Sequence, residues 1–524
     1  MPTGHDRDRG FNTPLLQALR THAGQGRVSF HVPGHDGGAA FPDGMLAGIG
    51  AIDTTELGST DDLNQPEGPA REAMRLAAEA FGAGSTLFLT GGSTCGILAM
   101  ITLAAAAGRR LLLPRAVHRA VPRAIALSGA EYVFLDEPGT PDPVRSFSPL
   151  VQPSPERIRE ALEQDPAIGA VWLTSPDYYG LCADLPAIAD IVRRAGAMLL
   201  VDEAHGAHLR FGRGLLPCCA MDAGADLCVQ SAHKTLPALT QAALLHVSAS
   251  AALRPGFGPD DVREAVSLFQ STSPSFPIAA SIDHSRAWME REGAGRIAAL
   301  AERIRSFSAA LPSGLRASGM ADPAVLRDPL RLVIDIGDTG IPGPVWLREL
   351  ADRGVDIEMA DLCRLVCIPG LTATDSMFRR LDDALRDILA HPPHDAPAEV
   401  RVTTSGMREL DHACSDAMLH ALPRTAHPRA LLPGVPGGRP VPIDAAAGRI
   451  CARALVPYPP GIPLVWPGEA PDAERLGLVR DLVSLGIAVD GVRIPDERGS
   501  SGPGTAEITM SEPCPVSGTR PYHV

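Results

Sequence analysis

The chain of 524 residues contains a single lysine, Lys234, although lysine and arginine together number 47. The remaining 46 of these basic residues are all arginine. Arginine can replace lysine as a solvated surface charge, but its guanidinium keeps its proton in proteins, whereas a buried ammonium group can lose it. A lysine retained in such a sequence indicates chemistry that needs an amine, above all a Schiff base to a carbonyl compound. The alternative is a chance survivor that contacts a phosphate or charges a helix end.

Other features that would define a protein class are also missing. No Cys-x-x-Cys pair occurs among the ten cysteines, which argues against a zinc site and favours reduced thiols in a cytoplasmic protein. The longest apolar stretch, "GILAMITLAAAAG", is too short to cross a bilayer, and the polar N-terminus lacks the apolar core of a secretory signal. A net charge of −14 argues against a general nucleic-acid binder. We therefore expect a cytoplasmic globular protein without membrane or nucleic-acid partners.

Short apolar runs alternate with helical patterns between about residues 85 and 250. The predicted strands lie in "STLFLT", "RLLLPR", "AVWLTS", "AMLLVDEAH" and "ADLCVQSAHK", and the predicted helices include "CGILAMITLAAAA" and "LPAIADIVRRAG". This alternation predicts an α/β fold, a mainly parallel sheet with helices on both faces. Further along, "LRLVIDIGD" and "GVDIEMADLCRLVCIPG" predict a smaller α/β unit. We expect an N-terminal segment (1–27), a large domain (28–296), a small α/β domain (297–392) and a C-terminal α+β domain with an irregular tail (393–524).

Polar groups follow the apolar runs, where parallel sheets bind ligands. In "LFLTGGSTCGILAM" a strand leads through Gly92, Ser93 and Thr94 into a helix. Glycines allow close approach to a ligand, and the helix N-terminus offers unpaired N–H groups, so this segment is a candidate phosphate cradle. An ordinary helix cap is the alternative.

Asp202 stands at the end of the very apolar run in "LLVDEAHGAH". A carboxylate in that place needs a partner, and the ring nitrogen of pyridoxal phosphate is one. A helix cap, a structural ion pair, or a metal site that uses His205 and His208 are the alternatives. Lys234 follows at the end of the next run, beside Ser231 and His233, which can donate to a phosphate. The candidate phosphate cradle, Asp202 and Lys234 follow one another along the chain. This order predicts a pyridoxal phosphate enzyme of fold type I.

The sequence resembles the Orn/Lys/Arg decarboxylase family over nearly its whole length. The segments that carry the resemblance are "FHVPGHDGG", "DTTELGSTDDLNQPEGPAREAMRLAAEAFGA", "TGGSTCG", "LPRAVHRAV", "TSPDYYG", "VDEAHGAH", "SAHKTLPALTQAALLHV", "STSPSFPIAASID" and "AAGRICARALVPYPPGIPLVWPGE". The resemblance implies a decarboxylase of arginine, lysine or ornithine in polyamine metabolism. It is similar to the shorter form of the family, without an N-terminal receiver-like domain.

The resemblance also implies roles for single residues. Lys234 would carry the cofactor, Asp202 would pair with its ring nitrogen, and His118 would stack on its ring. Gly92, Ser93, Thr94, Ser231 and His233 would surround the phosphate, and His205 would lie near the Schiff base. In a homodimer, Thr272 or Ser273 would reach the phosphate of the neighbouring subunit. Glu358 would bind the distal cation of the substrate, unless it is a solvated loop charge.

Two positions depart from the family pattern. Ala120 stands where a hydroxyl residue is expected, and Asp177 stands where threonine is usual, so the substrate could differ from the ordinary ones. Transamination, and a catalytically silent binding protein on the same scaffold, remain alternatives to decarboxylation. Production of a keto acid instead of CO₂ would identify the first, and absence of turnover the second.

Overall fold

A seven-stranded sheet forms the centre of the molecule. The computed structural model describes residues 10–42, 44–135, 148–317, 325–393, 403–422, 426–428, 438–493 and 506–511. Its strands lie in the order β1-β7-β6-β5-β4-β2-β3. They are β1 (Ser85–Leu89), β2 (Arg110–Pro114), β3 (Tyr132–Leu135), β4 (Ile168–Thr174), β5 (Met198–Asp202), β6 (Leu227–Gln230) and β7 (Ala243–Val247). Only β7 runs against its neighbours, β1 and β6, so the sheet is mainly parallel.

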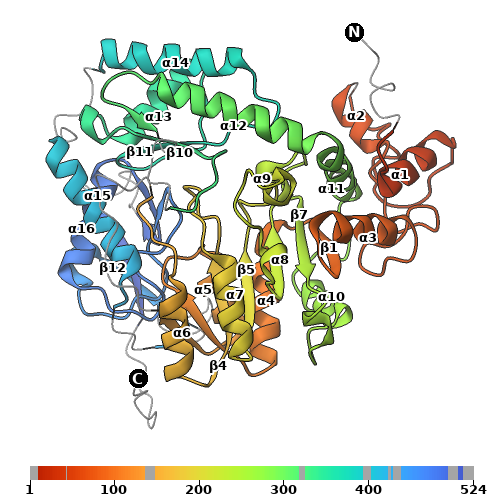
Figure 1. Cartoon of the computed structure of the whole chain (residues 1–524), viewed down its shortest axis with the longest axis horizontal. Coiled ribbons are helices and arrows are strands. Elements are labelled where there is room, and N and C mark those ends of the chain that lie inside the picture. The colour runs from red at the N-terminus through yellow and green to blue at the C-terminus, as the bar shows by residue number, and fades with distance from the viewer. Residues whose placement is uncertain are drawn as a thin grey trace.

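Helices cover both faces of this sheet, as Figure 1 shows. One face packs against α4 (Gly92–Ala106), α5 (Ala120–Ser128) and α10 (Pro259–Ser267), and the other against α6 (Pro155–Gln164), α7 (Leu185–Arg194) and α8 (Ala220–Ala223). Strand β4 shows why both faces need cover: Ala170 and Trp172 enter the first core, whereas Val171 and Leu173 enter the second. Such two-sided burial gives parallel strands their continuous apolar sequences.

The sequence-based strands and helices agree with this architecture. The five predicted strands are β1, β2, β4, β5 and β6, and the two quoted helices are α4 and α7. The α/β fold class is therefore confirmed. Strands β3, with the sequence "YVFL", and β7, with "ALLHV", were not predicted.

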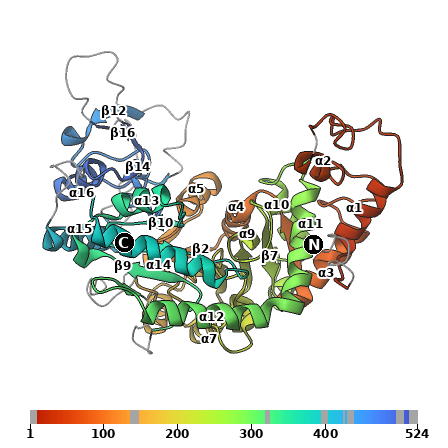
Figure 2. The same ribbon diagram turned by 90° about the horizontal axis from the view of Figure 1, so that it is seen from above.

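The N-terminal helices lie at one end of the sheet, beside β1. They are α1 (Pro14–Gly24), α2 (Met45–Gly50) and α3 (Pro69–Phe81), of which α1 and α3 pack with α11 (Phe276–Trp288). Asp283 in α11 accepts hydrogen bonds from the backbone N–H groups of Leu15 and Leu16 at the start of α1. Figure 2 shows this group opposite the C-terminal part of the chain, with the central sheet between them.

A second sheet follows the long helix α12 (Ala294–Ala309) and corresponds to the smaller α/β unit expected from the sequence. Its four strands lie in the order β10-β11-β9-β8. They are β8 (Arg316–Ala317), β9 (Leu332–Asp335), β10 (Met359–Ala360) and β11 (Arg364–Cys367), and α13 (Gly343–Asp352) and α14 (Asp375–Ala390) pack with them. The domain boundaries themselves stay a prediction.

The C-terminal part of the chain covers the β3 edge of the large sheet. It contains α15 (Thr404–Leu419), β12 (Gly438–Pro442), β13 (Val456–Tyr458), α16 (Ala473–Ser484), β14 (Ala488–Asp490), β15 (Val492–Arg493) and β16 (Glu507–Ser511). The buried Trp466 ring lies 5.8 Å from the ring of Tyr132 and 4.9 Å from that of Phe134, both on β3. A covered edge strand cannot pair with another chain. Most of the irregular C-terminal tail lies outside the described residues.

Within the described ranges, none of the helices combines the length and the apolar character that a membrane crossing requires.

Candidate active site

The polar side chains that follow the parallel strands meet around one cavity. Lys234 belongs to the one-turn helix α9 (Ala232–Thr235) directly after β6, and Asp202 is the last residue of β5. Both line a cavity of about 60 Å³ together with Ser93 after β1, His118 after β2 and His205. Residues 460–462 from the C-terminal part complete its wall. The topology thus brings together five of the predicted site residues from four segments, at the ends of β1, β2, β5 and β6.

The N-terminus of α4 forms one end of the site. Gly92 has a φ of +75° and open space where a Cβ would stand, and Gly91 provides no side-chain cap for the first turn of the helix. The hydroxyl of Ser231 donates to that of Ser93 across 2.9 Å, which ties the β6 loop to this helix end. Thr94 is exposed. Uncapped N–H groups and adjacent hydroxyls suit an anionic group such as a phosphate.

The His233 ring, beside Lys234, contacts the chain just before β7. Its Nδ1 atom lies 2.9 Å from the carbonyl oxygen of Ala242, at the start of the antiparallel strand β7. A carbonyl only accepts, so Nδ1 carries the hydrogen and Nε2 remains available. In this conformation the ring fixes α9 against β7.

Asp202 is buried, and the described residues give its carboxylate one hydrogen bond, from the backbone N–H of Ala204 at 3.1 Å. Burial raises the pKa of Asp202, whereas the positive charge of Lys234 lowers it. A buried carboxylate with so little compensation requires a cationic donor.

The partly buried His118 ring, also in the cavity, is held neutral. Burial and the nearby charges of Lys234, Arg119 and Arg123 lower the pKa of His118 to about 4. The backbone N–H of Ala120 donates to His118 Nδ1 at 3.2 Å, so the ring hydrogen resides on Nε2. Ala120, the first departure from the family pattern, therefore acts here through its backbone.

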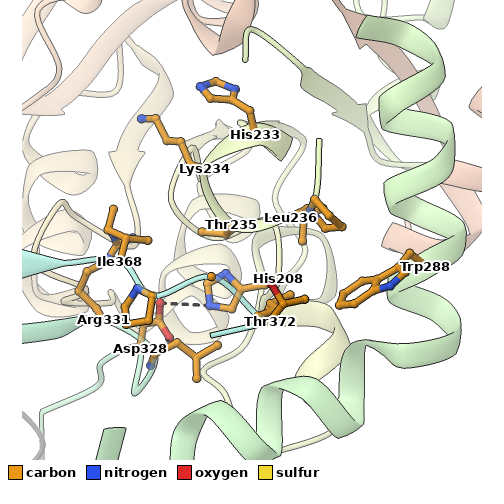
Figure 3. Close-up of a pocket in the computed structure, with 15 residues that line it drawn as sticks. His208, His233, Lys234, Thr235, Leu236, Trp288, Asp328, Arg331, Ile368 and Thr372 are labelled. Atoms are coloured by element: carbon orange, nitrogen blue, oxygen red, sulfur yellow. Dashed lines mark hydrogen bonds and ion pairs between the residues drawn. The ribbon is translucent and has the colours of Figure 1, made fainter. Parts of the chain in front are cut away.

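Lys234 Nζ lies 3.0 Å from Nε2 of His205 and 5.9 Å from the centre of the Tyr178 ring. Burial lowers the pKa of Lys234, while the charge of Asp202 opposes the change. Lys234 also lines a second cavity, of about 190 Å³. Figure 3 shows that cavity with His208, Asp328, Arg331 and Trp288 around it.

Two residues of the site were missed by the sequence reasoning. Arg331, directly before β9, is buried, and its Nη2 atom lies 3.2 Å from Nδ1 of His205. Tyr178 packs its ring 4.5 Å from that of His205, centre to centre, and donates its hydroxyl to Glu358. Neither could be chosen from one sequence, because Arg331 is one of 46 arginines and Tyr178 stands beside a second tyrosine. Glu358 is exposed but joins the site through Tyr178.

Asp177, the second departure, directs its carboxylate at the backbone. Oδ1 accepts the N–H groups of Tyr179 (2.9 Å) and Leu181 (2.8 Å), and Oδ2 accepts the hydroxyl of Ser148 (2.8 Å). Asp177 lines the smaller cavity, but its acceptor atoms hold the turn after β4. Its carboxylate has a structural role in this arrangement.

The metal alternative has no support from the geometry. His205 contacts Lys234 and Arg331, while His208 Nε2 pairs with Asp328 Oδ2 at 3.1 Å. Among the residues that the structure describes, no cluster of three metal-ligating side chains occurs. Thr272 and Ser273 are exposed and do not line either cavity of this chain.

These observations fit pyridoxal phosphate chemically. The cavity offers an amine in Lys234, a buried carboxylate in Asp202 that needs a cationic N–H donor, and a neutral ring in His118 for stacking. The uncapped end of α4 with Ser93 and Ser231 offers donors for a phosphate.

Comparison with known proteins agrees with the geometry. Residues 13–323 match the major domain of the Orn/Lys/Arg decarboxylases, and residues 423–485 match their C-terminal domain. The chain belongs to the Orn/Lys/Arg decarboxylase family. This confirms the family and the enzyme class, an amino acid decarboxylase, that were predicted from the sequence.

Individual family members match over most of their length. The chain is 34% identical to the uncharacterized protein YaaO of Bacillus subtilis and 32% identical to the arginine decarboxylase of Bacillus anthracis, in each case over 92% of this chain and at least 95% of the relative. The structure of lysine decarboxylase A from Pseudomonas aeruginosa superposes with a TM-score of 0.78 at 22% identity, over 95% of this chain and 80% of that one. The shared fold agrees with the predicted fold class.

Proposed function

We propose that this member of the Orn/Lys/Arg decarboxylase family uses pyridoxal phosphate to convert a basic amino acid, with arginine as the first candidate, to the corresponding amine and CO₂. The observation that carries the proposal is the convergence of the only lysine, the buried Asp202 and the neutral His118 on one cavity. The similarity to the arginine decarboxylase of Bacillus anthracis suggests the substrate. The amine product would place the enzyme in polyamine-type metabolism.

Each of these residues would contact a different part of the cofactor. Lys234 would bind it covalently, Asp202 would accept from its ring nitrogen, and His118 would lie on the ring face. Gly92, Ser93, Thr94, Ser231 and His233 are the proposed phosphate neighbours. When bound, the cofactor supplies an acceptor for the electron pair that remains at Cα after CO₂ departs. The buried Asp202 would keep that acceptor strong, because its carboxylate would favour a protonated ring nitrogen.

Lys234, His205 and Glu358 would carry the catalytic and substrate-binding roles. Lys234 and His205, whose nitrogen atoms lie 3.0 Å apart, are the groups that would move protons at Cα. Glu358 would hold the distal ammonium or guanidinium of the substrate through charge-assisted hydrogen bonds. Tyr178, which donates to Glu358, fixes the direction of that carboxylate.

A dimer would complete the proposed site. Thr272 and Ser273 lie exposed on this chain, as expected for residues that serve a neighbouring subunit. We propose that they reach the phosphate of the partner's cofactor.

The deciding experiment measures CO₂ release from arginine, lysine and ornithine by the purified enzyme with pyridoxal phosphate, with the Lys234→Ala variant as control. Release from one of these amino acids that disappears in the variant supports the proposal and names the substrate. A keto acid without CO₂ would indicate transamination. Cofactor absorbance without turnover of any candidate would instead indicate a silent binding protein.

A further inference from the structure

His205 stands between two basic side chains, and this arrangement restricts its hydrogen positions. Its Nδ1 atom lies 3.2 Å from Nη2 of Arg331, and its Nε2 atom lies 3.0 Å from Nζ of Lys234. Both distances are within hydrogen-bonding range. Arg331 is 2% exposed and His205 5% exposed, so water does not substitute for either contact.

The donors and acceptors can be assigned by elimination. A guanidinium only donates, so Nδ1 of His205 accepts and carries no hydrogen. The neutral ring must then carry its hydrogen on Nε2, which points at Lys234. Nε2–H can donate to Lys234 only if Nζ has a lone pair, and an ammonium group has none.

We infer that Arg331 is a positioning residue: by donating to Nδ1 it fixes the His205 tautomer whose Nε2–H holds Lys234 as an uncharged amine. The inference rests on the proposed function, because an uncharged amine is the form that Lys234 needs in order to bond to the carbonyl of a cofactor. Arg331 lies directly before β9 of the four-stranded sheet, whereas His205 and Lys234 follow strands of the seven-stranded sheet.

The other groups that face Lys234 are compatible with this assignment. Asp202 and Glu358 favour the charged form of the amine, whereas Arg331 and the burial of the site disfavour it. His118 and His233 both stay neutral, since burial lowers the pKa of each ring. The Tyr178 hydroxyl donates to Glu358. Burial and the charge of Arg331 also lower the pKa of His205, which agrees with a ring that carries a single hydrogen.

The single lysine makes a direct test available. The full-length enzyme is produced with ¹³C-labelled lysine and freed of cofactor. Its NMR spectrum then contains one lysine side-chain signal, because the chain has one lysine. The chemical shift of that signal, followed as a function of pH, reports the protonation of Lys234. We expect a midpoint below the ordinary value of about 10.4. Arg331→Met should raise that midpoint by about one pH unit or more. An unchanged midpoint would overturn the inference.

The same substitution in a His205→Phe chain distinguishes an effect of Arg331 through the His205 tautomer from direct charge repulsion between Arg331 and Lys234. In a His205→Phe chain, Arg331→Met should move the midpoint by less than about a third of its effect in the original chain, because the hydrogen bonds through the ring are gone. Equal shifts in both backgrounds would show that Arg331 acts by charge alone. Arg475→Met, at a buried arginine of the C-terminal part, is the matched control and should leave the midpoint unchanged.

His205→Gln provides a conservative rescue should Arg331→Met fail to fold. Its amide oxygen can accept from Arg331 while its NH₂ group donates to Lys234, so a midpoint close to that of the original chain is expected. A midpoint as high as that of His205→Phe would contradict the inference. The titration needs no turnover, so it gives an answer even if CO₂ release fails and the proposed function is rejected.

Discussion

Arg115 and Glu469, 354 positions apart in the sequence, form an ion pair of 2.6 Å with both side chains about 1% exposed. Arg115 follows β2 and also donates to the carbonyl oxygens of Pro463 and Leu464 at 3.0 Å. Glu469 in turn accepts the N–H of Trp466 at 2.7 Å. The pair joins the large sheet to the segment whose residues 460–462 close the smaller cavity.

Arg115→Met should therefore lower the free energy of unfolding by roughly 3–5 kcal/mol, because it leaves Glu469 charged and buried. Urea unfolding followed by tryptophan fluorescence measures the loss. Arg119→Met, which removes an exposed partner of Asp490, should cost less than about 1 kcal/mol. A similar loss in both variants would contradict the role given to the buried pair.

Asp177 should prove to be structural and not a determinant of substrate choice. Asp177→Thr keeps an acceptor for the turn, so we expect unchanged preference among basic amino acids and a small change in stability. Asp177→Ala removes the acceptor of two backbone N–H groups and should cost about 1–3 kcal/mol for each group left unsatisfied. A new substrate preference in Asp177→Thr would show instead that the carboxylate faces the substrate.

His118 should make stability depend on pH in the acidic range. Its pKa is about 4 in the folded chain, below the ordinary histidine value of 6.5 that applies to the unfolded chain, so the unfolded chain binds a proton first as the pH falls. The contribution to stability is fully present above pH 6.5 and is lost as the pH falls toward 4. Between about pH 7 and about pH 5 we expect a loss of about 2 kcal/mol that His118→Phe does not show. Urea midpoints of both proteins at the two pH values measure it, and parallel pH profiles would refute it.

Glu358→Gln should raise KM for a basic amino acid about ten- to a hundredfold with a smaller change in kcat, since it removes a charge-assisted hydrogen bond to the distal group. Steady-state CO₂ release measures both constants. Tyr178→Phe is the control, because it removes only the hydroxyl that orients Glu358 and should have the smaller effect on KM. Equal KM values for Glu358→Gln and the unmodified enzyme would show that Glu358 is a solvated loop charge that does not bind the substrate.

Subunit complementation tests the proposed dimer. Lys234→Ala and a Thr272→Ala/Ser273→Ala double variant should each have low activity alone, because each spoils both sites of its homodimer. Mixed and reassociated, they form heterodimers with one intact site, and about a quarter of full activity should return. Activity that stays at the sum of the separate variants would place Thr272 and Ser273 outside the partner's site.

The sequence by itself determined the layered fold and the core of the site. Strand residues buried on both faces have continuous apolar sequences, and Asp202 and Lys234 could be recognised as polar residues at the ends of such runs. Lys234 could also be chosen by chemistry alone, because an arginine cannot serve as an amine. Ser93, Ser231 and His118 followed from their places after strands or from the family pattern.

Only the tertiary structure decided how these groups are held and which others join them. Arg331 and Tyr178 reach His205 from 126 and 27 positions away, and one sequence has no periodicity that records such contacts. The partners of a side chain were equally hidden: Asp177 follows a strand like Asp202, yet its carboxylate accepts three hydrogen bonds that hold a turn, whereas that of Asp202 accepts one. Position along a strand is a local property, whereas the partner of a buried polar group depends on where distant loops meet.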